Sequence, residues 1–257
     1  MSRIQNAFTK GKAFIPFVTG GDPDLDTTEK LIYEMAAKGA DLIEIGIPFS
    51  DPIAEGPVIQ EADERALRGG CTTDQLFGLV EKVRKTLDIP LVFMTYVNPI
   101  YSYGSEKFMR NCKRVGIDGV IVPDLPFEEK DELKPICEQY GIELISLIAP
   151  TSKERIKMIA KEAEGFIYCV SSMGVTGVRS EITSDIGGMV SLVREVTDIP
   201  VAIGFGIATP QQAEDMAKFG DGVIVGSAIV RMIAAQGRKS VKAVGEYVAG
   251  MKAAANK

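Results

Sequence analysis

The sequence predicts an α/β protein whose eight parallel strands close into a (β/α)8 TIM barrel. One phrase recurs along the chain: a helical pattern, a glycine, a small or acidic residue and a short β-branched run. Strand-like runs that alternate with helical segments are typical of βαβ units and a parallel sheet. No Pro/Ser-rich linker divides the 257 residues, and such barrels typically have roughly 250. We therefore expect a single barrel domain over residues 1–257. The open doubly wound sheet is the alternative, but no GxGxxG follows the first strand.

The expected strands follow one another at regular intervals. In the recurrent phrase, glycine suits the left-handed residue that ends a helix, and the apolar run suits a parallel strand buried on both faces. The phrase occurs at 38–46, 115–124, 140–150 and 219–227. Asp-Ile-Pro introduces two more strands, at 87–96 and 197–206, and the runs 12–21 and 164–172 complete the set.

Capping boxes mark where helices begin between these strands. In such a box, a capping side chain and a Glu or Gln three residues later satisfy backbone N–H groups of the first turn. The pairs are Asp26 and Glu29, Thr72 and Gln75, Thr151 and Glu154, and Thr209 and Gln212, the last with Pro210 at the first helical position. Residues 1–14 lack the apolar core of a signal peptide, and we expect them to form an extra, short amphipathic helix.

Composition excludes several classes of partner. A net charge of −6 and a pI near 5.0 give no basic surface for nucleic acid or an anionic membrane. No apolar run approaches the roughly 18–20 residues that span a bilayer. The four cysteines have no CxxC spacing, which favours buried structural thiols in the reducing cytoplasm over a metal site. Cys112, Cys137 and Cys169 fall in helical or apolar patterns, so we expect them to be buried.

The chain contains no histidine, and this restricts its chemistry more than any motif does. Ser-His-Asp and Cys-His nucleophile systems, zinc sites with histidine ligands and histidine general bases are all excluded. Any proton transfer must therefore use Asp, Glu, Lys, Tyr or Cys, with a carboxyl group as the first candidate.

The stretch "LIEIGIPFSDPIAEGP" (42–57) contains the most unusual carboxylate. Side chains alternate along a strand, so Ile43 and Ile45 would face the helices, and Glu44 would face the barrel interior. Desolvation raises the pKa of an interior carboxyl group, which makes it a proton donor near neutral pH. The alternative is a structural glutamate that a buried partner satisfies.

Proline stiffens the loop that follows Glu44. Pro48, Pro52 and Pro57 each fix φ. Asp51 precedes a proline and is expected to bond its own backbone in a turn. Glu55 is either a solvated charge, which the pattern favours, or a carboxylate that reaches over the mouth of the barrel.

Three glycine-rich segments predict a phosphate site. The runs 204–206 and 225–230 follow the last two strands, and a short helix is expected to begin at Ser227. Backbone N–H groups at this corner bind phosphate in many (β/α)8 barrels. The segment 171–180 adds Gly174 and Gly177 as a possible lid.

Aromatic residues at strand ends are candidates for an aromatic pocket, although such residues more often belong to the barrel core. They are Phe17, Tyr96 and Tyr168, and Asp124 is a further candidate for a polar contact.

These segments resemble the tryptophan synthase alpha chain family. The longest is "ADLIEIGIPFSDPIAEGPVIQ" (40–60). The others are "FIPFVTGGDP" (14–23), "VPDLPFEE" (122–129), "SSMGVTG" (171–177), "GFGI" (204–207) and "VGSAIV" (225–230), all in the family's order. The resemblance implies a cytoplasmic lyase of tryptophan biosynthesis that cleaves indole-3-glycerol phosphate to indole and glyceraldehyde 3-phosphate. It implies no cofactor in this chain, and a β subunit that carries pyridoxal phosphate (PLP) in an α2β2 complex.

The resemblance also assigns site residues by position. Glu44 matches the catalytic glutamate, and Glu55 matches the second catalytic carboxylate. Phe17, Tyr168 and Thr176 match substrate contacts, and Gly177, Gly206, Gly226 and Ser227 match the phosphate site. One position departs from the family pattern: Ala-Asp-Gly-Pro is Ala54-Glu55-Gly56-Pro57 here, so the carboxylate lies one methylene further from the backbone.

Two alternatives remain for the function. One is another phosphate-binding barrel enzyme, such as an isomerase or a decarboxylase, although the sequence contains no Asp-x-Lys-x-x-Asp cluster. The other is a weakly active or inactive subunit that binds and activates a β partner.

Overall fold

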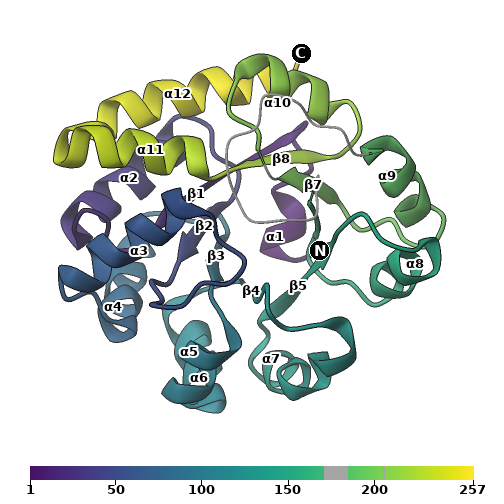
Figure 1. Cartoon of the computed structure of the whole chain (residues 1–257), viewed down its shortest axis with the longest axis horizontal. Coiled ribbons are helices and arrows are strands. Elements are labelled where there is room, and N and C mark those ends of the chain that lie inside the picture. Colours follow the sequence, from purple (N-terminus) through teal and green to yellow (C-terminus); the bar gives the residue numbers. More distant parts are fainter. Residues whose placement is uncertain (171–184, 205) are drawn as a thin grey trace.

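The strands of the computed structural model, which describes residues 1–170, 185–204 and 206–257, form a closed parallel barrel. They pair in chain order, and β8 returns to pair with β1 (Figure 1). The strands are β1 (Ala13–Thr19), β2 (Ile43–Gly46), β3 (Leu91–Met94), β4 (Gly119–Ile121), β5 (Glu143–Ile148), β6 (Ile167–Val170), β7 (Val201–Gly204) and β8 (Gly222–Val225). The predicted (β/α)8 fold is confirmed.

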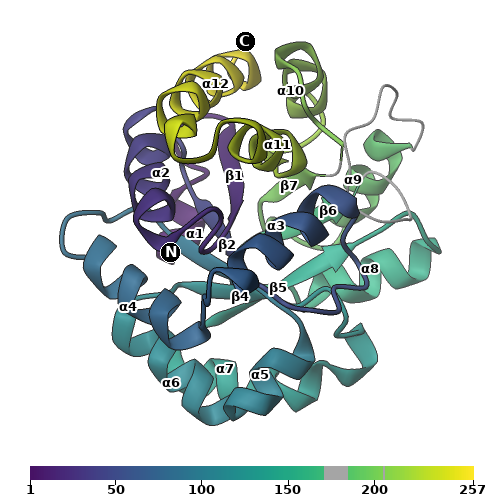
Figure 2. The same cartoon turned by 60° about the vertical axis from the view of Figure 1, so that its left-hand side comes forward.

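Helices surround the strands (Figures 1 and 2). The helices are α1 (Arg3–Asn6), α2 (Leu25–Ala37), α3 (Pro57–Arg68), α4 (Thr73–Val83), α5 (Val97–Tyr103), α6 (Ser105–Val115), α7 (Lys134–Tyr140), α8 (Lys153–Lys161), α9 (Ile186–Arg194), α10 (Pro210–Ala217), α11 (Ser227–Gln236) and α12 (Ser240–Ala255), with 3-10 helices η1 (Phe127–Glu132) and η2 (Gly237–Lys239). Among the described residues, none of these helices is long and apolar enough to cross a membrane.

The predicted helix starts are partly right. Thr72 and Thr209 form the predicted capping boxes. α2 begins earlier than predicted, because the Asp24 carboxylate rather than Asp26 accepts the backbone N–H of Thr27, at 2.8 Å. α8 begins at a cap formed by Ser152 rather than Thr151. Neither Asp24 nor Ser152 is followed three residues later by Glu or Gln. The capping-box motif therefore selected a residue close to the true cap in both helices.

The acidic residue of the recurrent phrase holds neighbouring strands together. Asp41, Asp118 and Asp221 each precede a strand and accept a backbone N–H at the start of the strand beside it. The donors are Phe14 at 2.7 Å, Leu91 at 2.8 Å and Val201 at 2.8 Å. Each carboxylate also pairs with a cation: Lys252, Arg84 and Arg194, respectively. These hydrogen bonds give partners to backbone N–H groups at the starts of the strands, where the parallel ladder supplies none.

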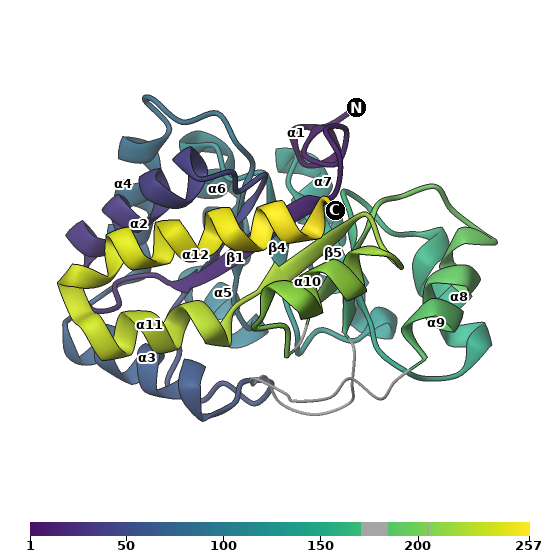
Figure 3. The same ribbon diagram turned by 90° about the horizontal axis from the view of Figure 1, so that it is seen from above.

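The α1 helix closes the end of the barrel at which the strands begin. Ile4 is completely buried among interior side chains such as Ile121 and Phe166, and the ring of Phe8 lies 5.7 Å from that of Phe166. Figure 3 shows both termini on the same side of the molecule, where the N–H of Lys12 donates to Asn256 at 2.9 Å.

The cysteines behave as predicted. Cys112, Cys137 and Cys169 are buried, Cys71 is half-buried, and all four are free thiols. In the helices and strands they fill apolar space between the barrel and the helix layer, as small hydrophobic residues do.

Candidate active site

Glu44 is the second residue of β2 and lies in the barrel interior, opposite Phe17 of β1 and Val92 of β3. Its side chain is only 1% exposed, and Oε1 has no hydrogen-bond partner among the described residues. Burial, and then the charge of Glu55, raise the pKa of Glu44 well above its ordinary value. The Glu44 carboxyl group therefore keeps its proton where an exposed glutamate would have lost it.

Glu55 is 5% exposed, so the solvated position that the pattern favoured is wrong. The predicted loop ends at Gly56, which caps α3, and Pro57 occupies the first helical position. This helix, absent from the sequence interpretation, turns the glutamate inward over the barrel mouth. Glu55 raises the pKa of both Glu44 and Tyr168, so its carboxylate faces the same space.

Two aromatic rings border that space, and glycines make room for them. Tyr168 of β6 lies against Gly204 of β7, where a Cβ atom would be 2.6 Å from Cε1 and 2.7 Å from the hydroxyl of the tyrosine. Phe17 lies against Gly46 of β2, where a Cβ atom would be 2.6 Å from Cζ. Burial, and then Glu44 and Glu55, raise the pKa of the Tyr168 hydroxyl, so it remains a neutral donor.

Tyr96 and Gln60 hold the loop that carries Glu55. The hydroxyl of Tyr96 accepts the N–H of Ala54 at 3.0 Å, and Gln60 Nε2 donates to the Glu55 carbonyl oxygen at 2.7 Å. Asp51 is exposed and accepts the Ser50 hydroxyl at 2.5 Å, in place of the predicted bond to its own backbone.

Asp124, the further polar candidate, accepts the N–H of Val97 at 3.0 Å. It therefore braces the start of α5 beside the barrel mouth.

The predicted phosphate residues occupy the ends of β7 and β8. Gly206 follows β7 with φ +88°, Gly226 caps α11, and Ser227 is its first residue. All three are half-buried. The N-terminus of α11 presents N–H groups that have no partner within the helix, together with the positive end of the helix dipole. Thr176 and Gly177 lie outside the described residues, as does Gly174.

The sequence interpretation missed two acidic residues near this mouth. Asp63 on α3 is 5% exposed, and burial followed by the charge of Glu55 raises its pKa to about 8. Asp22, after β1, is 1% exposed and binds Arg65 of α3 through two hydrogen bonds of 2.9 Å. An available signal was Asp63 itself, an acid on the otherwise apolar stripe formed by Ile59, Ala62 and Ala66.

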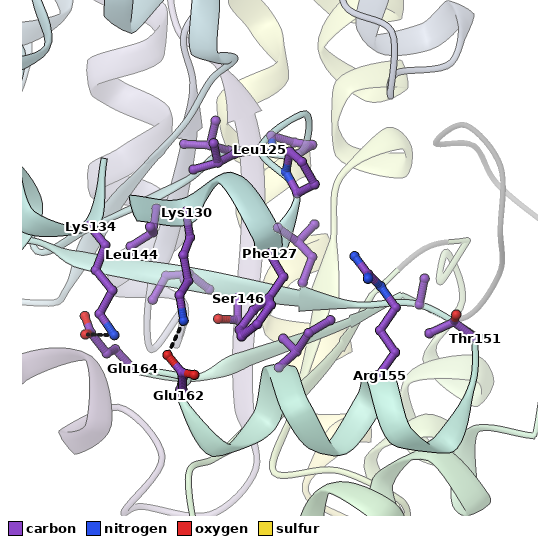
Figure 4. A pocket seen from close by; sticks show the side chains of 17 residues that line it. Leu125, Phe127, Lys130, Lys134, Leu144, Ser146, Thr151, Arg155, Glu162 and Glu164 are labelled. Carbon is purple, nitrogen blue, oxygen red and sulfur yellow. Dashed lines mark hydrogen bonds and ion pairs between the residues drawn. The ribbon is translucent and has the colours of Figure 1, made fainter. Parts of the chain in front are cut away.

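A separate cavity of about 340 Å³ lies on the flank of the barrel, along β5 beneath η1, α7 and α8. Figure 4 shows that the Lys130 and Lys134 side chains in it already pair with Glu162 and Glu164. None of the predicted site residues lines this cavity. Glu44 and Glu55, the expected acid–base groups, lie away from this cavity.

Comparison with known proteins agrees with this geometry. The family model for the tryptophan synthase alpha chain matches residues 4–256. The chain belongs to the tryptophan synthase alpha chain family.

Individual members of the family match over nearly their whole length. The tryptophan synthase alpha chain of Lacticaseibacillus casei is 47% identical, over 96% of this chain and 93% of that protein. The protein of the same name from Thermoanaerobacter sp. (strain X514) is 48% identical, over 98% and 99%. A structure of Mycobacterium tuberculosis tryptophan synthase superposes with a TM-score of 0.90 at 33% identity, over 100% of this chain and 99% of that one.

Family membership settles the class of activity. The chain is a lyase of tryptophan biosynthesis, and the family's reaction is the cleavage of indole-3-glycerol phosphate. The family needs no cofactor in this chain, because PLP belongs to the β subunit with which it works. Nothing in the comparisons favours another phosphate-binding barrel enzyme or an inactive partner subunit.

Proposed function

We propose that this chain cleaves indole-3-glycerol phosphate with two buried carboxyl groups, Glu44 as the proton shuttle and Glu55 as the acceptor for the indole N–H. The observation that carries the proposal is the environment of Glu44. It lies inside the barrel, its Oε1 atom has no partner among the described residues, and its pKa is raised. A glutamate in this state can give a proton to a substrate in a protein without histidine.

The bond that breaks joins C3 of the indole to the hydroxyl-bearing carbon of the glycerol chain. Glu44 protonates C3, and Glu55 stabilises the positive charge that this places on the ring nitrogen. The Glu44 carboxylate then takes the proton of the glycerol hydroxyl. The carbon–carbon bond breaks, its electron pair returns to the ring, and the two products are indole and an aldehyde, glyceraldehyde 3-phosphate.

The surrounding residues orient the substrate. Phe17 and Tyr168 border the space for the indole ring, and Thr176 is proposed as a further contact. Gly177, Gly206, Gly226 and Ser227 are proposed to bind the phosphate, with the N-terminus of α11 supplying N–H groups. Binding of the remote phosphate then fixes the reacting carbon against Glu44.

The β partner is proposed to dock at the mouth of the barrel in an α2β2 complex. Ile53, in the loop that carries Glu55, is 75% exposed, and Tyr101 of α5 is 77% exposed. Apolar side chains this exposed at one end of a molecule suit a protein interface. The four free thiols support the proposed location in the reducing cytoplasm.

Substitution of the two glutamates tests the proposal. Glu44→Gln and Glu55→Gln keep the shape but remove the acid–base groups, so indole release should fall by about 10²–10⁴-fold. Calorimetry should show that indole-3-glycerol phosphate still binds, because the phosphate and aromatic contacts remain. Glu143→Gln is the control, since Glu143 is a half-buried glutamate whose pKa is also raised, but it lies at the opposite end of the barrel. Normal turnover in Glu44→Gln would remove Glu44 from the mechanism.

A further inference from the structure

An ion pair at the mouth of the barrel joins α3 to the loop after β1. The Asp22 carboxylate is 1% exposed, and Arg65 of α3 donates to both of its oxygens, through Nε and a terminal nitrogen, at 2.9 Å each. Such a bidentate pair has a fixed geometry, because the planar guanidinium matches the two carboxylate oxygens. The pair therefore sets the position of α3 as well as neutralising a buried charge.

Beside the ion pair, α3 approaches this loop closely through small side chains. A Cβ atom on Gly21 would lie 2.6 Å from Sγ of Cys71, just beyond α3, and 3.5 Å from Cβ of Ala66. Ala62, one turn earlier on the same face of the helix, packs with Phe17 of β1. Alanine methyl groups bury little apolar area, so these contacts hold the helix less firmly than larger side chains would. The ion pair supplies the directional contact.

The loop after β1 is braced by hydrogen bonds of its own. The backbone N–H of Gly21 donates to the hydroxyl of Thr28 in α2 at 3.0 Å, and that hydroxyl donates to the carbonyl oxygen of Asp24 at 3.0 Å. Asp22 therefore lies in a segment that is fixed to both β1 and α2. Its carboxylate is a firm anchor for Arg65.

The opposite end of α3 carries Glu55. Gly56 caps the helix and Pro57 is its first residue, so Glu55 directly precedes the cap. The side chain of Gln60, near the start of the helix, donates to the carbonyl oxygen of Glu55 at 2.7 Å. The backbone at Glu55 is therefore tied to α3, and a displacement of the helix would carry the carboxylate with it.

We propose that Asp22 and Arg65 are positioning residues that fix α3 on the barrel and thereby place the carboxylate of Glu55 for the reaction. The inference rests on the role proposed above for Glu55. Arg65 lies eight residues after Pro57, which is about 12 Å along a helix, so a tilt of about 5° about Arg65 would displace the end that carries Glu55 by about 1 Å. A misplacement of about 1 Å can cost about a hundredfold in rate.

Arg65→Lys is the first test, because lysine keeps the positive charge beside Asp22 but cannot form the two parallel hydrogen bonds. In the complex with its β subunit, kcat for indole release should fall about ten- to a hundredfold. KM for indole-3-glycerol phosphate should change little, because the phosphate residues proposed at the ends of β7 and β8 are not part of α3. Arg238→Lys is the matched control. Arg238 pairs with Asp24 of the same loop at 2.6 Å but lies on η2, so this change should leave kcat unaltered.

Combination with Glu55→Gln separates a positioning role from a general loss of structure. If Arg65 acts through Glu55, Arg65→Lys should have little further effect on kcat once the Glu55 carboxylate is gone, so the two losses should not add. Asp22→Asn, which keeps one carbonyl acceptor for Arg65, should lower kcat with the same dependence on Glu55. This second variant decides the question on its own if Arg65→Lys does not fold.

Two results would overturn the inference. One is a wild-type kcat in folded Arg65→Lys or Asp22→Asn protein, with folding established by circular dichroism at the assay temperature. The other is a loss of kcat that is equally large with and without the Glu55 carboxylate. The two proposals can also fail separately. Wild-type turnover in Glu55→Gln refutes the role of Glu55, whereas a slow Glu55→Gln enzyme beside a fully active Arg65→Lys enzyme refutes only the positioning role.

Discussion

Glu44 and Glu55 are the same residue type in two different environments. Glu44 is enclosed by strands, and its side-chain Oε1 has no hydrogen-bond partner within the described residues. Glu55 lies at the N-terminal end of α3 on a loop held by Tyr96 and Gln60. Two carboxyl groups in different environments can supply acid and base roles without histidine.

Because the pKa of Glu44 is raised, this residue should lower the free energy of unfolding as the pH rises, and Glu44→Gln should remove that effect. Below the ordinary glutamate pKa, both folded and unfolded states hold the proton, and Glu44 has no effect on the pH dependence. As the pH rises, the unfolded state releases this proton while the folded state keeps it, so folding becomes less favourable. From pH 4 upward, the Tm of Glu44→Gln should therefore rise relative to that of the wild type, at about 2–4 °C per kcal/mol. A constant difference in Tm across this range would contradict the prediction.

Glu55→Asp restores the family's residue but is expected to impair this chain. The longer side chain is buried beside the loop that Tyr96 holds, and shortening it should withdraw the carboxylate from the proposed position of the indole nitrogen. A misplacement on the order of 1 Å can cost about a hundredfold in rate, so kcat should fall while KM changes little. Steady-state kinetics of both proteins with the same β subunit measures this. A faster Glu55→Asp enzyme would show that the loop is built for aspartate.

At the scale of elements, glycines at the ends of strands make room for the aromatic walls of the site. A Cβ atom on Gly204 would overlap the ring of Tyr168, which is itself buried. Gly204→Ala should therefore displace Tyr168, raise KM about tenfold or more, and cost about 1–3 kcal/mol of stability. The matched control is Gly250→Ala in α12, where an added Cβ atom would meet nothing within 4 Å beyond the backbone of its own helix, and the change should stabilise by about 0.5–1 kcal/mol. An unaltered KM in Gly204→Ala would mean that Tyr168 does not contact substrate.

Sequence patterns predicted the strands better than the helix that matters most for the site. The period-two alternation around Glu44 placed this side chain in the interior correctly, because a strand fixes the direction of each side chain. The burial of Glu55 depends on α3, and a proline among loop residues gave no sign that a helix starts at Pro57. Asp63 was missed for the same reason, since the apolar stripe on which it lies becomes a signal only once α3 is known to be a helix that packs against α11.

At the scale of the whole molecule, stability and chemistry are concentrated at opposite ends of the barrel. The carboxylates Asp41, Asp118 and Asp221 tie the starts of strands together, and α1 closes the same end. The proposed acid–base groups lie at the other end, where (β/α)8 enzymes generally have their active sites. The recurrent sequence pattern predicted the barrel because each copy contains the residues for the same helix end, turn and strand.

Ile4→Ala tests this separation. The side chain is completely buried against Gly119 and Gly165, so its truncation leaves a cavity that should cost about 2–5 kcal/mol in the free energy of unfolding. Urea unfolding measures that loss, while kcat for indole release at 25 °C should stay near the wild-type value. A large fall in kcat without a loss of stability would contradict the division between the two ends.

The closure of one end by α1 has a further consequence for the order of events in the reaction. Layers of interior side chains and Ile4 fill the barrel below Glu44 in the part of the chain that the structure describes. The substrate would then enter, and both products would leave, through the mouth of the barrel beside the loop that carries Glu55. A β subunit bound at the mouth of the barrel would control which product leaves first. Docking would therefore affect the order of product release as well as the chemical step.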